Sequence, residues 1–273
     1  MNFLFWNIQK NKGTFETIHK LLLSEDIDIL LLAEFPECPP EELLLSLNTK
    51  HSLYKYEHVE KSAPYDKVEI FTRFSALSIV PLKDTKRLSA KKFFSPLLEK
   101  DITIITCHLP SKATPGFEKN QSEYAEDVKE FIDEVEKQAG HKRTIMCGDF
   151  NMDPFEEGGI KAKGLHAINN KAIAVRNIKR TVNAKEYHLF YNPMWKLYNN
   201  EPVPGTHYYN SSNYINYYWH IYDQIIMRPE LVNCFNEDAL RIITGFDNSL
   251  LTPNHQIDNK YSDHLPIKFN FKI

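Results

Sequence analysis

Cysteine and glycine are scarce in this sequence, and each shortage excludes a class of protein. The four cysteines lie far apart, with no CxxC motif and no Cys/His pairing. This spacing argues against a zinc site and against a dense disulfide framework, and it favours reduced thiols. With only 9 glycines, 42% hydrophobic residues and 25% charged residues, the composition is that of an ordinary folded chain rather than a disordered or fibrous one.

Long hydrophobic runs are missing as well. The best candidate, Ile29 to Ala33, is flanked by Asp28 and Glu34 and is too short to span a bilayer. The first residues do not resemble a signal peptide, because no basic region precedes a long apolar one. We therefore expect no membrane insertion and a cytoplasmic location.

Neither sign of charge dominates the chain. A net charge of -3 gives no general attraction to polyanions, so a nucleic-acid partner must be held by a local basic surface and by bound metal. Internal repeats, low-complexity tracts and convincing linkers are also absent from the sequence. We expect residues 1–273 to form one domain with a deep core.

The sequence does contain a series of short apolar segments with the character of buried strands. Runs that are apolar throughout suit a sheet covered by helices, whereas the alternation in the last segment indicates a half-buried strand. The expected strands are Asn2 to Asn7, Ile27 to Ala33, Asp101 to Cys107, Thr144 to Cys147, His220 to Met227 and Leu265 to Ile273.

Apolar residues at helical spacing predict two helices. The first begins at Phe15, with Thr14 as its expected N-cap. The second carries an apolar face from Tyr124 to Val135, and Gly140 is placed to end it.

Polar side chains stand where the expected strands stop. They are Asn7, Glu34, His108, Asp149, Asn151, Asp263 and His264. Strand ends can bring such side chains together at one rim of a sheet, and an acid-rich set suits a hard cation that prefers oxygen ligands. Asp223, in a neighbouring expected strand, could hold the second ring nitrogen of His264 and so prepare it to handle protons.

The order of these motifs resembles the endonuclease/exonuclease/phosphatase superfamily. The resemblance covers about Asn2 to Phe271, and six motifs occur in family order. They are Trp6-Asn7, Ala33-Glu34, Cys107-His108-Leu109, Gly148-Asp149-Phe150-Asn151, Tyr222-Asp223-Gln224 and Ser262-Asp263-His264. The resemblance implies an α+β fold, a four-layer α/β/β/α sandwich in which two mixed β-sheets pack face to face with outer helices.

The resemblance also implies Mg²⁺ or Mn²⁺ as cofactor and a role for each motif residue. Glu34 would be the main metal ligand, with Asn7 and Asp263 near the metal. Asp149 would orient or deprotonate the attacking water, and Asn151 would hold the phosphoryl group or the water. His264, oriented by Asp223, would stabilise the developing charge or act as the base, and His108 would contact the scissile phosphate or the leaving group.

Two positions depart from branches of the family. Gln9 stands where abasic-site nucleases usually have an acid, which puts a second metal in doubt. Met152-Asp153 follows Asn151 without the arginine of inositol-polyphosphate phosphatases, which weakens a phosphoinositide substrate. Tyr124 matches a phosphate-contacting tyrosine of the abasic branch by distance, but it also begins the apolar face of a helix.

Charge and aromatics favour nucleic acid as the substrate. No acidic residue lies between Lys161 and Lys185, and that stretch is rich in lysine and arginine. Tyrosines and tryptophans follow from Tyr187 to Trp219, and aromatics beside cations suit unstacked bases. The candidate substrate-binding residues are Lys112, Tyr124, Arg176, Lys179 and Arg180.

The same residues also suit roles that involve no nucleic acid. The lysines could form a solvated face and the tyrosines could pack a sheet. An aromatic patch could also receive a phospholipid, so a phosphatase or phosphodiesterase acting on a phospholipid or small phosphoester is the alternative function. A non-catalytic binding module is a third possibility, although the presence of every carboxylate and histidine argues against it.

Overall fold

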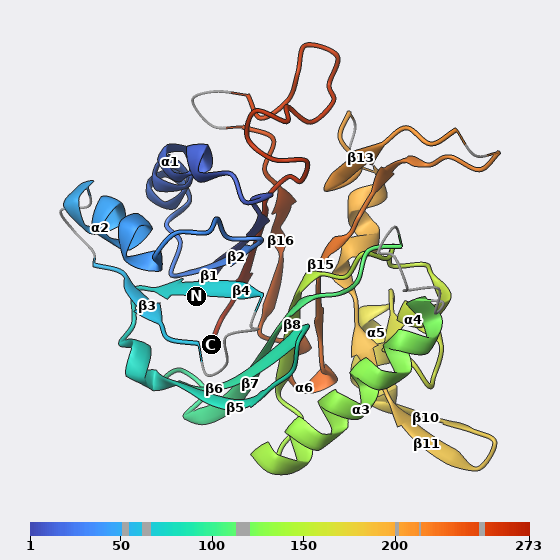
Figure 1. Cartoon of the computed structure of the whole chain (residues 1–273). Coiled ribbons are helices and arrows are strands. Elements are labelled where there is room, and N and C mark those ends of the chain that lie inside the picture. The colour runs from blue at the N-terminus through green and yellow to red at the C-terminus, as the bar shows by residue number, and fades with distance from the viewer. Residues whose placement is uncertain (51–54, 62–66, 113–120, 200–201, 213, 246–248) are drawn as a thin grey trace.

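A computed structural model gives the fold of this chain, and it describes residues 1–50, 55–61, 67–112, 121–199, 202–212, 214–245 and 249–273. Within these residues, two mixed β-sheets face each other and helices lie on the outer sides (Figure 1). The predicted four-layer sandwich is therefore confirmed.

The first sheet is built around β1 (Asn2–Asn7) and β2 (Ile29–Ala33), which run parallel. Every residue of β2 is buried, as expected for an aliphatic run covered on both faces. The strand order is β16-β17-β1-β2-β4-β3, where β16 is Phe235–Ile242, β17 is Ile267–Phe271, β4 is Val68–Thr72 and β3 is Glu57–Val59. β17 alternates between buried and half-buried residues, which confirms the predicted half-buried strand.

The second sheet is built around β7 (Lys100–His108) and β8 (Thr144–Asp149), which also run parallel. β15 (Asp223–Met227) pairs antiparallel with β8 and is buried throughout. The strand order is β5-β6-β7-β8-β15-β12-β9, where β5 is Ile79–Asp84, β6 is Leu88–Ser95, β12 is Phe190–Tyr191 and β9 is Ala167–Ile168.

Helices close the sandwich on both sides. Helices α1 (Phe15–Glu25) and α2 (Pro40–Lys50) cover the first sheet, and α3 (Gln121–Ala139) covers the second (Figure 1). The larger hydrophobic core fills the space between the sheets and beneath α1 and α2, whereas a smaller core lies between the second sheet and α3. β1 packs across from β8 and β15, so the two sheets meet where the predicted site residues lie.

Helix α3 follows the predicted pattern. Val128, Phe131, Ile132 and Val135 are buried against the second sheet, and Gly140 follows the helix with a left-handed φ of 72°. Tyr124 is half-buried and packs against the same core. No helix in the described segments is both long enough and apolar enough to cross a membrane.

One local prediction was right only in position, and another was wrong. Thr14 stands directly before α1, but its side chain does not cap that helix, because a 3₁₀ turn, η1 (Lys12–Thr14), leads into it. The Thr14 hydroxyl donates to the Asn11 carbonyl, and the Asn11 side chain caps the turn. The segment His220 to Met227 is not one strand, because Ile221 N–H donates to the Asp153 carboxylate instead of a neighbouring strand.

The remaining elements are short. They are η2 (Ala76–Ser78), α4 (Glu157–Ile160), α5 (Lys171–Asn177), β10 (Lys179–Val182), β11 (Lys185–His188), η3 (Pro193–Asn199), β13 (His207–Tyr209), β14 (Tyr218–His220) and α6 (Pro229–Val232). β10 pairs with β11 and β13 with β14, and each pair forms an antiparallel hairpin.

A buried ion pair fastens α3 to the end of β15. The Arg228 guanidinium, which is 0% exposed, donates from Nε and Nη2 to the Glu136 carboxylate at 2.7 and 3.0 Å. Lys142 Nζ donates to the same carboxylate at 2.9 Å. Burial alone would raise the pKa of Glu136, but these two cations hold it below its ordinary value.

Because of His166, we expect the free energy of unfolding to fall in mild acid. Its side chain is buried beside Arg180, and burial lowers its pKa from 6.5 to about 4. Below pH 6.5 the unfolded chain takes up a proton that the folded chain refuses, so this residue should lower the free energy of unfolding by up to about 2 kcal/mol by about pH 5. The loss is absent above pH 6.5 and complete once the pH falls through about 4.

Urea denaturation of the wild type and of His166→Asn across this pH range tests the prediction. Asparagine keeps a donor for the His188 carbonyl, which His166 Nδ1 contacts at 3.2 Å, and it tolerates the left-handed φ of 52°. The variant should lose less stability on acidification than the wild type. Equal losses in the two proteins would exclude His166 as the source.

Candidate active site

The ends of five strands meet at one edge of the sandwich. His108 at the end of β7 is paired in register with Asp149 at the end of β8, and Asp149 is paired with Asp223 at the start of β15. From the first sheet, Asn7 ends β1 and Glu34 directly follows β2. A cavity of about 460 Å³ opens here, lined by Glu34, His108, Ser111, Lys112, Asp149, Asn151, His207, Tyr209, Tyr222, Asp263 and His264. The predicted convergence at one rim is therefore present in the structure.

The Gly148 to Asn151 segment owes its shape to close backbone packing. A Cβ at Gly148 would lie 2.0 Å from the Cys107 carbonyl oxygen, so only glycine fits. Beyond it, Asn151 N–H donates to Asp149 Oδ1 at 2.8 Å, and Asn151 Nδ2 donates to the Leu109 carbonyl at 2.9 Å. These bonds fix both side chains at the cavity, and Asn151 adopts a left-handed φ of 49° that asparagine tolerates.

Asn7 connects the carboxylates of the two sheets. Its Nδ2 donates to Asp149 Oδ2 at 3.1 Å and to Glu34 Oε1 at 3.3 Å, while its Oδ1 accepts from Gln9 N at 3.1 Å. Asn7 thus orients both acids and does not turn its oxygen to the cavity. Glu34 has a left-handed φ of 48°, which turns the chain immediately after β2.

Asp223 and His264 form a buried dyad. His264 Nδ1 donates to Asp223 Oδ2 at 2.7 Å, and its Nε2 lies 3.9 Å from Asp149 Oδ2. Burial alone would lower the pKa of His264, but the carboxylate of Asp223, with Asp149 and Asp263, raises it to about 10. The imidazole is therefore held as a cation at neutral pH, with Asp223 fixing its orientation.

Asp149 occupies the centre of these contacts. The residue is 2% exposed, and burial raises the pKa of its carboxyl, against the opposing effect of the His264 cation. Its Oδ2 lies 3.8 Å from His108 Nε2, which itself lies 3.5 Å from Glu34 Oε1. Asp149 thus stands among two histidines and the Asn7 amide, on the side of the cavity opposite to solvent.

For three further groups at the site, no role was predicted from the sequence. His207 packs against His264, with ring centroids 4.6 Å apart, and donates from Nδ1 to the Asp263 carbonyl. Tyr222 stacks between His207 and His220, with centroid distances of 5.3 and 4.8 Å. His220 is held by Asp153 at 2.7 Å. Burial lowers the pKa of His207 to about 4, so this imidazole is neutral beside a charged one.

The predicted substrate-binding residues are divided between two places. Lys112 lies at the cavity, where its Nζ pairs with Glu156 at 2.6 Å and lies 5.9 Å from the centre of the Tyr222 ring. Tyr124 is engaged in packing on α3.

Arg176, Lys179 and Arg180 lie elsewhere, on α5 and β10. Leu189, directly after β11, bonds to Ile178 and to Arg228, which follows the far end of β15. Figure 1 shows the β10–β11 hairpin projecting at the end of the sandwich away from the β13–β14 hairpin. The structure therefore does not bring these three residues to the site, because the part of the basic stretch that carries them, α5 and β10, folds near the opposite end of β15.

The donors at the cavity fit a divalent cation that prefers oxygen. The Glu34 side chain is 31% exposed, and Asp263 is half-buried in the same wall. One or two carboxylates with several waters are what Mg²⁺ requires, and Mn²⁺ accepts the same ligands. A buried group of Asp149, Asp223 and His264 could also hold a metal ion, as could His207, Asp263 and His264. One oxygen of Asp223 in the first group is buried without a hydrogen-bond partner among the described residues.

Comparison with known proteins relates this architecture to solved structures. The sequence matches no family model and no curated protein. An endonuclease/exonuclease/phosphatase family protein from Leptotrichia buccalis is 13% identical, with a TM-score of 0.58 over 100% of each chain. A mannosyl-6-phosphatase from Bacteroides thetaiotaomicron is 15% identical, with a TM-score of 0.57 over 99% of this chain and 98% of that one.

An AP endonuclease from Archaeoglobus fulgidus is also similar, at 15% identity and a TM-score of 0.56 over 100% of each chain. These identities are low, so the likeness concerns the fold. The neighbours include both nucleases and phosphatases by name. By its architecture, this chain has the endonuclease/exonuclease/phosphatase fold.

Proposed function

We propose that this protein is a divalent-metal-dependent phosphodiesterase that hydrolyses nucleic acid, and that residues 1–273 form its single catalytic domain. The observation that carries the proposal is the convergence of Glu34, His108, Asp149 and His264 on one cavity, with Asn7 and Asp223 hydrogen-bonded to these residues. Phosphodiester hydrolysis needs a neutralised phosphate, a positioned water and donors for the charge of the transition state. The cavity offers residues for each task.

The geometry supports a division of roles among these residues. Glu34, with Asp263, would hold Mg²⁺ or Mn²⁺, which supplies charge neutralisation at the phosphate oxygens. Asp149, an acceptor fixed by Asn7 and Asn151, would orient the attacking water and receive its proton. His264, a cation held by Asp223, would donate to the charge that develops on the phosphorane. His108 and Asn151 would contact the phosphate or the leaving group.

Support for nucleic acid comes from the β13–β14 hairpin rather than from the basic stretch. Tyr209 lines the cavity and is 57% exposed, and Tyr217 and Tyr218 are 58% and 48% exposed. Exposed aromatic rings beside a phosphodiester site provide platforms on which unpaired bases stack. Single-stranded or unstacked nucleic acid therefore fits this surface better than a rigid duplex.

The test is a substrate panel with matched variants. Plasmid, single-stranded DNA, structured RNA, nucleotides and phospholipid are incubated with Mg²⁺, with Mn²⁺ or with a chelator. Cleavage of a polynucleotide should require metal, and Glu34→Gln should lower kcat/KM at least about a hundredfold, because charge neutralisation at the phosphate contributes several kcal/mol. Glu41→Gln, at an exposed position on α2, is the matched control and should match the wild type.

The same panel decides among the alternatives. Phosphate release only from lipids or small esters would replace nucleic acid with a small phosphoester, and the likeness to a mannosyl-6-phosphatase makes this the second candidate. Binding of a substrate without turnover of any of them would indicate that the protein is a non-catalytic binding module. Cleavage that survives complete chelation would contradict the metal requirement.

A further inference from the structure

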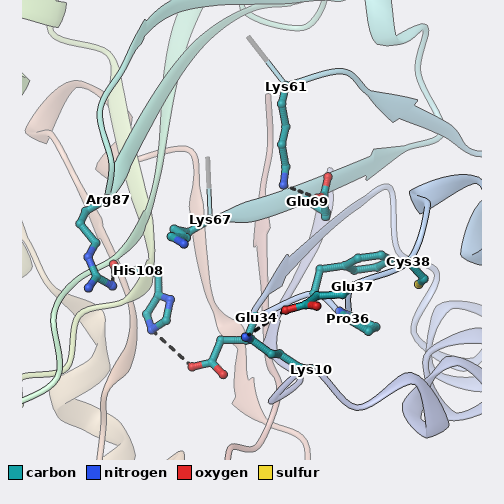
Figure 2. Close-up of a pocket in the computed structure, with 11 residues that line it drawn as sticks. Lys10, Glu34, Pro36, Glu37, Cys38, Lys61, Lys67, Glu69, Arg87 and His108 are labelled. Atoms are coloured by element: carbon teal, nitrogen blue, oxygen red, sulfur yellow. Dashed lines mark hydrogen bonds and ion pairs between the residues drawn. The ribbon is translucent and has the colours of Figure 1, made fainter. Parts of the chain in front are cut away.

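A second cavity opens beside the catalytic one. It measures about 510 Å³, and Glu34 and His108 line both cavities (Figure 2). Its remaining walls come from the segments after β1, β2 and β3, from β4 with the residue before it, and from the turn between β5 and β6. A substrate whose phosphate lies at Glu34 and His108 can therefore extend into this second space.

The second cavity carries positive charge that its own acids do not compensate. Lys61 pairs with Glu69, which is also bound by His58, and Lys10 lies 3.7 Å from Glu37. Lys67 and Arg87 also line the cavity, and no carboxylate of the described residues lies within ion-pair distance of either. Figure 2 shows these two cations beside the His108 imidazole, with Glu34 across from them.

Arg87 is held at a fixed place relative to His108. The Arg87 carbonyl accepts from His108 N–H at 3.1 Å, and Arg87 Nη1 donates to the His108 carbonyl at 3.4 Å. The turn that carries Arg87 is closed by Thr85, whose backbone N–H donates to the Leu88 carbonyl at 2.7 Å. A guanidinium offers several N–H donors in one plane, an arrangement that suits phosphate oxygens.

We propose that the second cavity binds a second phosphate group of the substrate, between Lys67 and Arg87, while the scissile phosphate lies at Glu34 and His108. The inference rests on the proposed function. The second group is either the neighbouring phosphodiester of a nucleic-acid strand or a terminal phosphate of a nucleotide. Both kinds of ligand carry a phosphate at a fixed distance from the scissile phosphate.

Binding by calorimetry tests the proposal without turnover. The full chain carrying Asp149→Asn is titrated, in Mg²⁺, with thymidine 5′-monophosphate, thymidine 3′,5′-bisphosphate and the dinucleotide pTpT. The second phosphate should tighten Kd about tenfold, as expected for charge-assisted hydrogen bonds. Adding Lys67→Ala or Arg87→Ala should remove most of that gain and leave Kd for the monophosphate within about twofold.

Lys86→Ala is the matched control, because Lys86 is exposed in the same turn and does not line the cavity. A gain with pTpT alone identifies a strand, and a gain with the bisphosphate alone identifies a terminal phosphate. The proposal is overturned if neither ligand binds more tightly than the monophosphate, or if the gain survives in the Lys67→Ala/Arg87→Ala protein. Hydrolysis of bis(p-nitrophenyl) phosphate by the wild type is measured separately. Turnover without the gain rejects only the second cavity, and the gain without turnover rejects only the catalytic function.

Discussion

Asp149→Asn is expected to lower kcat for phosphodiester hydrolysis by about a thousandfold or more, because it removes the acceptor proposed to orient and deprotonate water. The amide has nearly the same size as the carboxyl, so the bond from Asn151 N–H can remain. The amide nitrogen that replaces Oδ2 cannot accept from Asn7 Nδ2, so the free energy of unfolding should fall by about 1–3 kcal/mol while the protein stays folded, and KM should change less than kcat. Steady-state kinetics on the substrate identified by the panel, with circular dichroism as a check of folding, measures the effect.

His264→Gln and Asp223→Asn provide the comparison for this prediction. Both should lower kcat by a factor of about a hundred to ten thousand, and the double variant should lose little beyond the worse single variant, because the two residues act as a unit. Lys179→Ala, on the hairpin at the far end of the sandwich, is the control and should keep full activity. An Asp149→Asn protein with wild-type kcat would remove Asp149 from the proposed chemistry.

Arg228→Met is expected to lower the free energy of unfolding by about 3–5 kcal/mol, the usual effect of removing one partner of a buried ion pair. Methionine fills similar space, but Glu136 then keeps only Lys142 as a cation. The Leu189 carbonyl also loses the donor that Arg228 Nη1 supplies at 3.1 Å. Urea denaturation at neutral pH measures the change.

The double variant Arg228→Met/Glu136→Leu separates the ion pair from general packing. It should be more stable than Arg228→Met alone, because no acid is left buried without its main partner. Lys179→Ala, which breaks the exposed pair with Glu186, should cost at most about 1 kcal/mol. A loss below about 1 kcal/mol in Arg228→Met would show that the buried pair contributes little to stability. Activity at low temperature should be unchanged, because Arg228 lies beyond the end of β15 that is remote from Asp223.

Local sequence patterns predicted the strands that carry the site, since each is a short apolar run that ends in a polar residue. Asn7, Glu34 and Asp149 were identified in this way, and the structure joins them through one amide. His207 could not be found by the same argument. It comes to His264 only because the β13–β14 hairpin folds back over the start of β15, and no local pattern encodes that contact.

The basic stretch is a local sequence pattern that predicted a contact with the site wrongly. Lys161 to Lys185 is continuous in the sequence and comes after β8, the strand that carries Asp149, which predicted a basic surface near the site. In the structure, Lys161 pairs with Glu126 on α3 and Lys171 lies near Glu237, so much of its charge is already compensated. Charges that are neighbours along the chain are distributed by the fold. The cations beside the site that pair with no carboxylate of the described residues, Lys67 and Arg87, come from other segments.

Two hydrogen bonds link the two halves of the sandwich at the candidate site, from Asn7 on β1 to Asp149 on β8 and from His264, just before β17, to Asp223 on β15. The separation of the two sheets thus sets the length of both bonds. A single methylene added to a side chain between β1 and β8 would push the two sheets apart. We expect Asp149 and His264 to shift relative to Glu34 in a protein that remains folded. Substitutions deep in the interior, far from any substrate atom, should therefore reduce turnover in proteins that still fold and still bind.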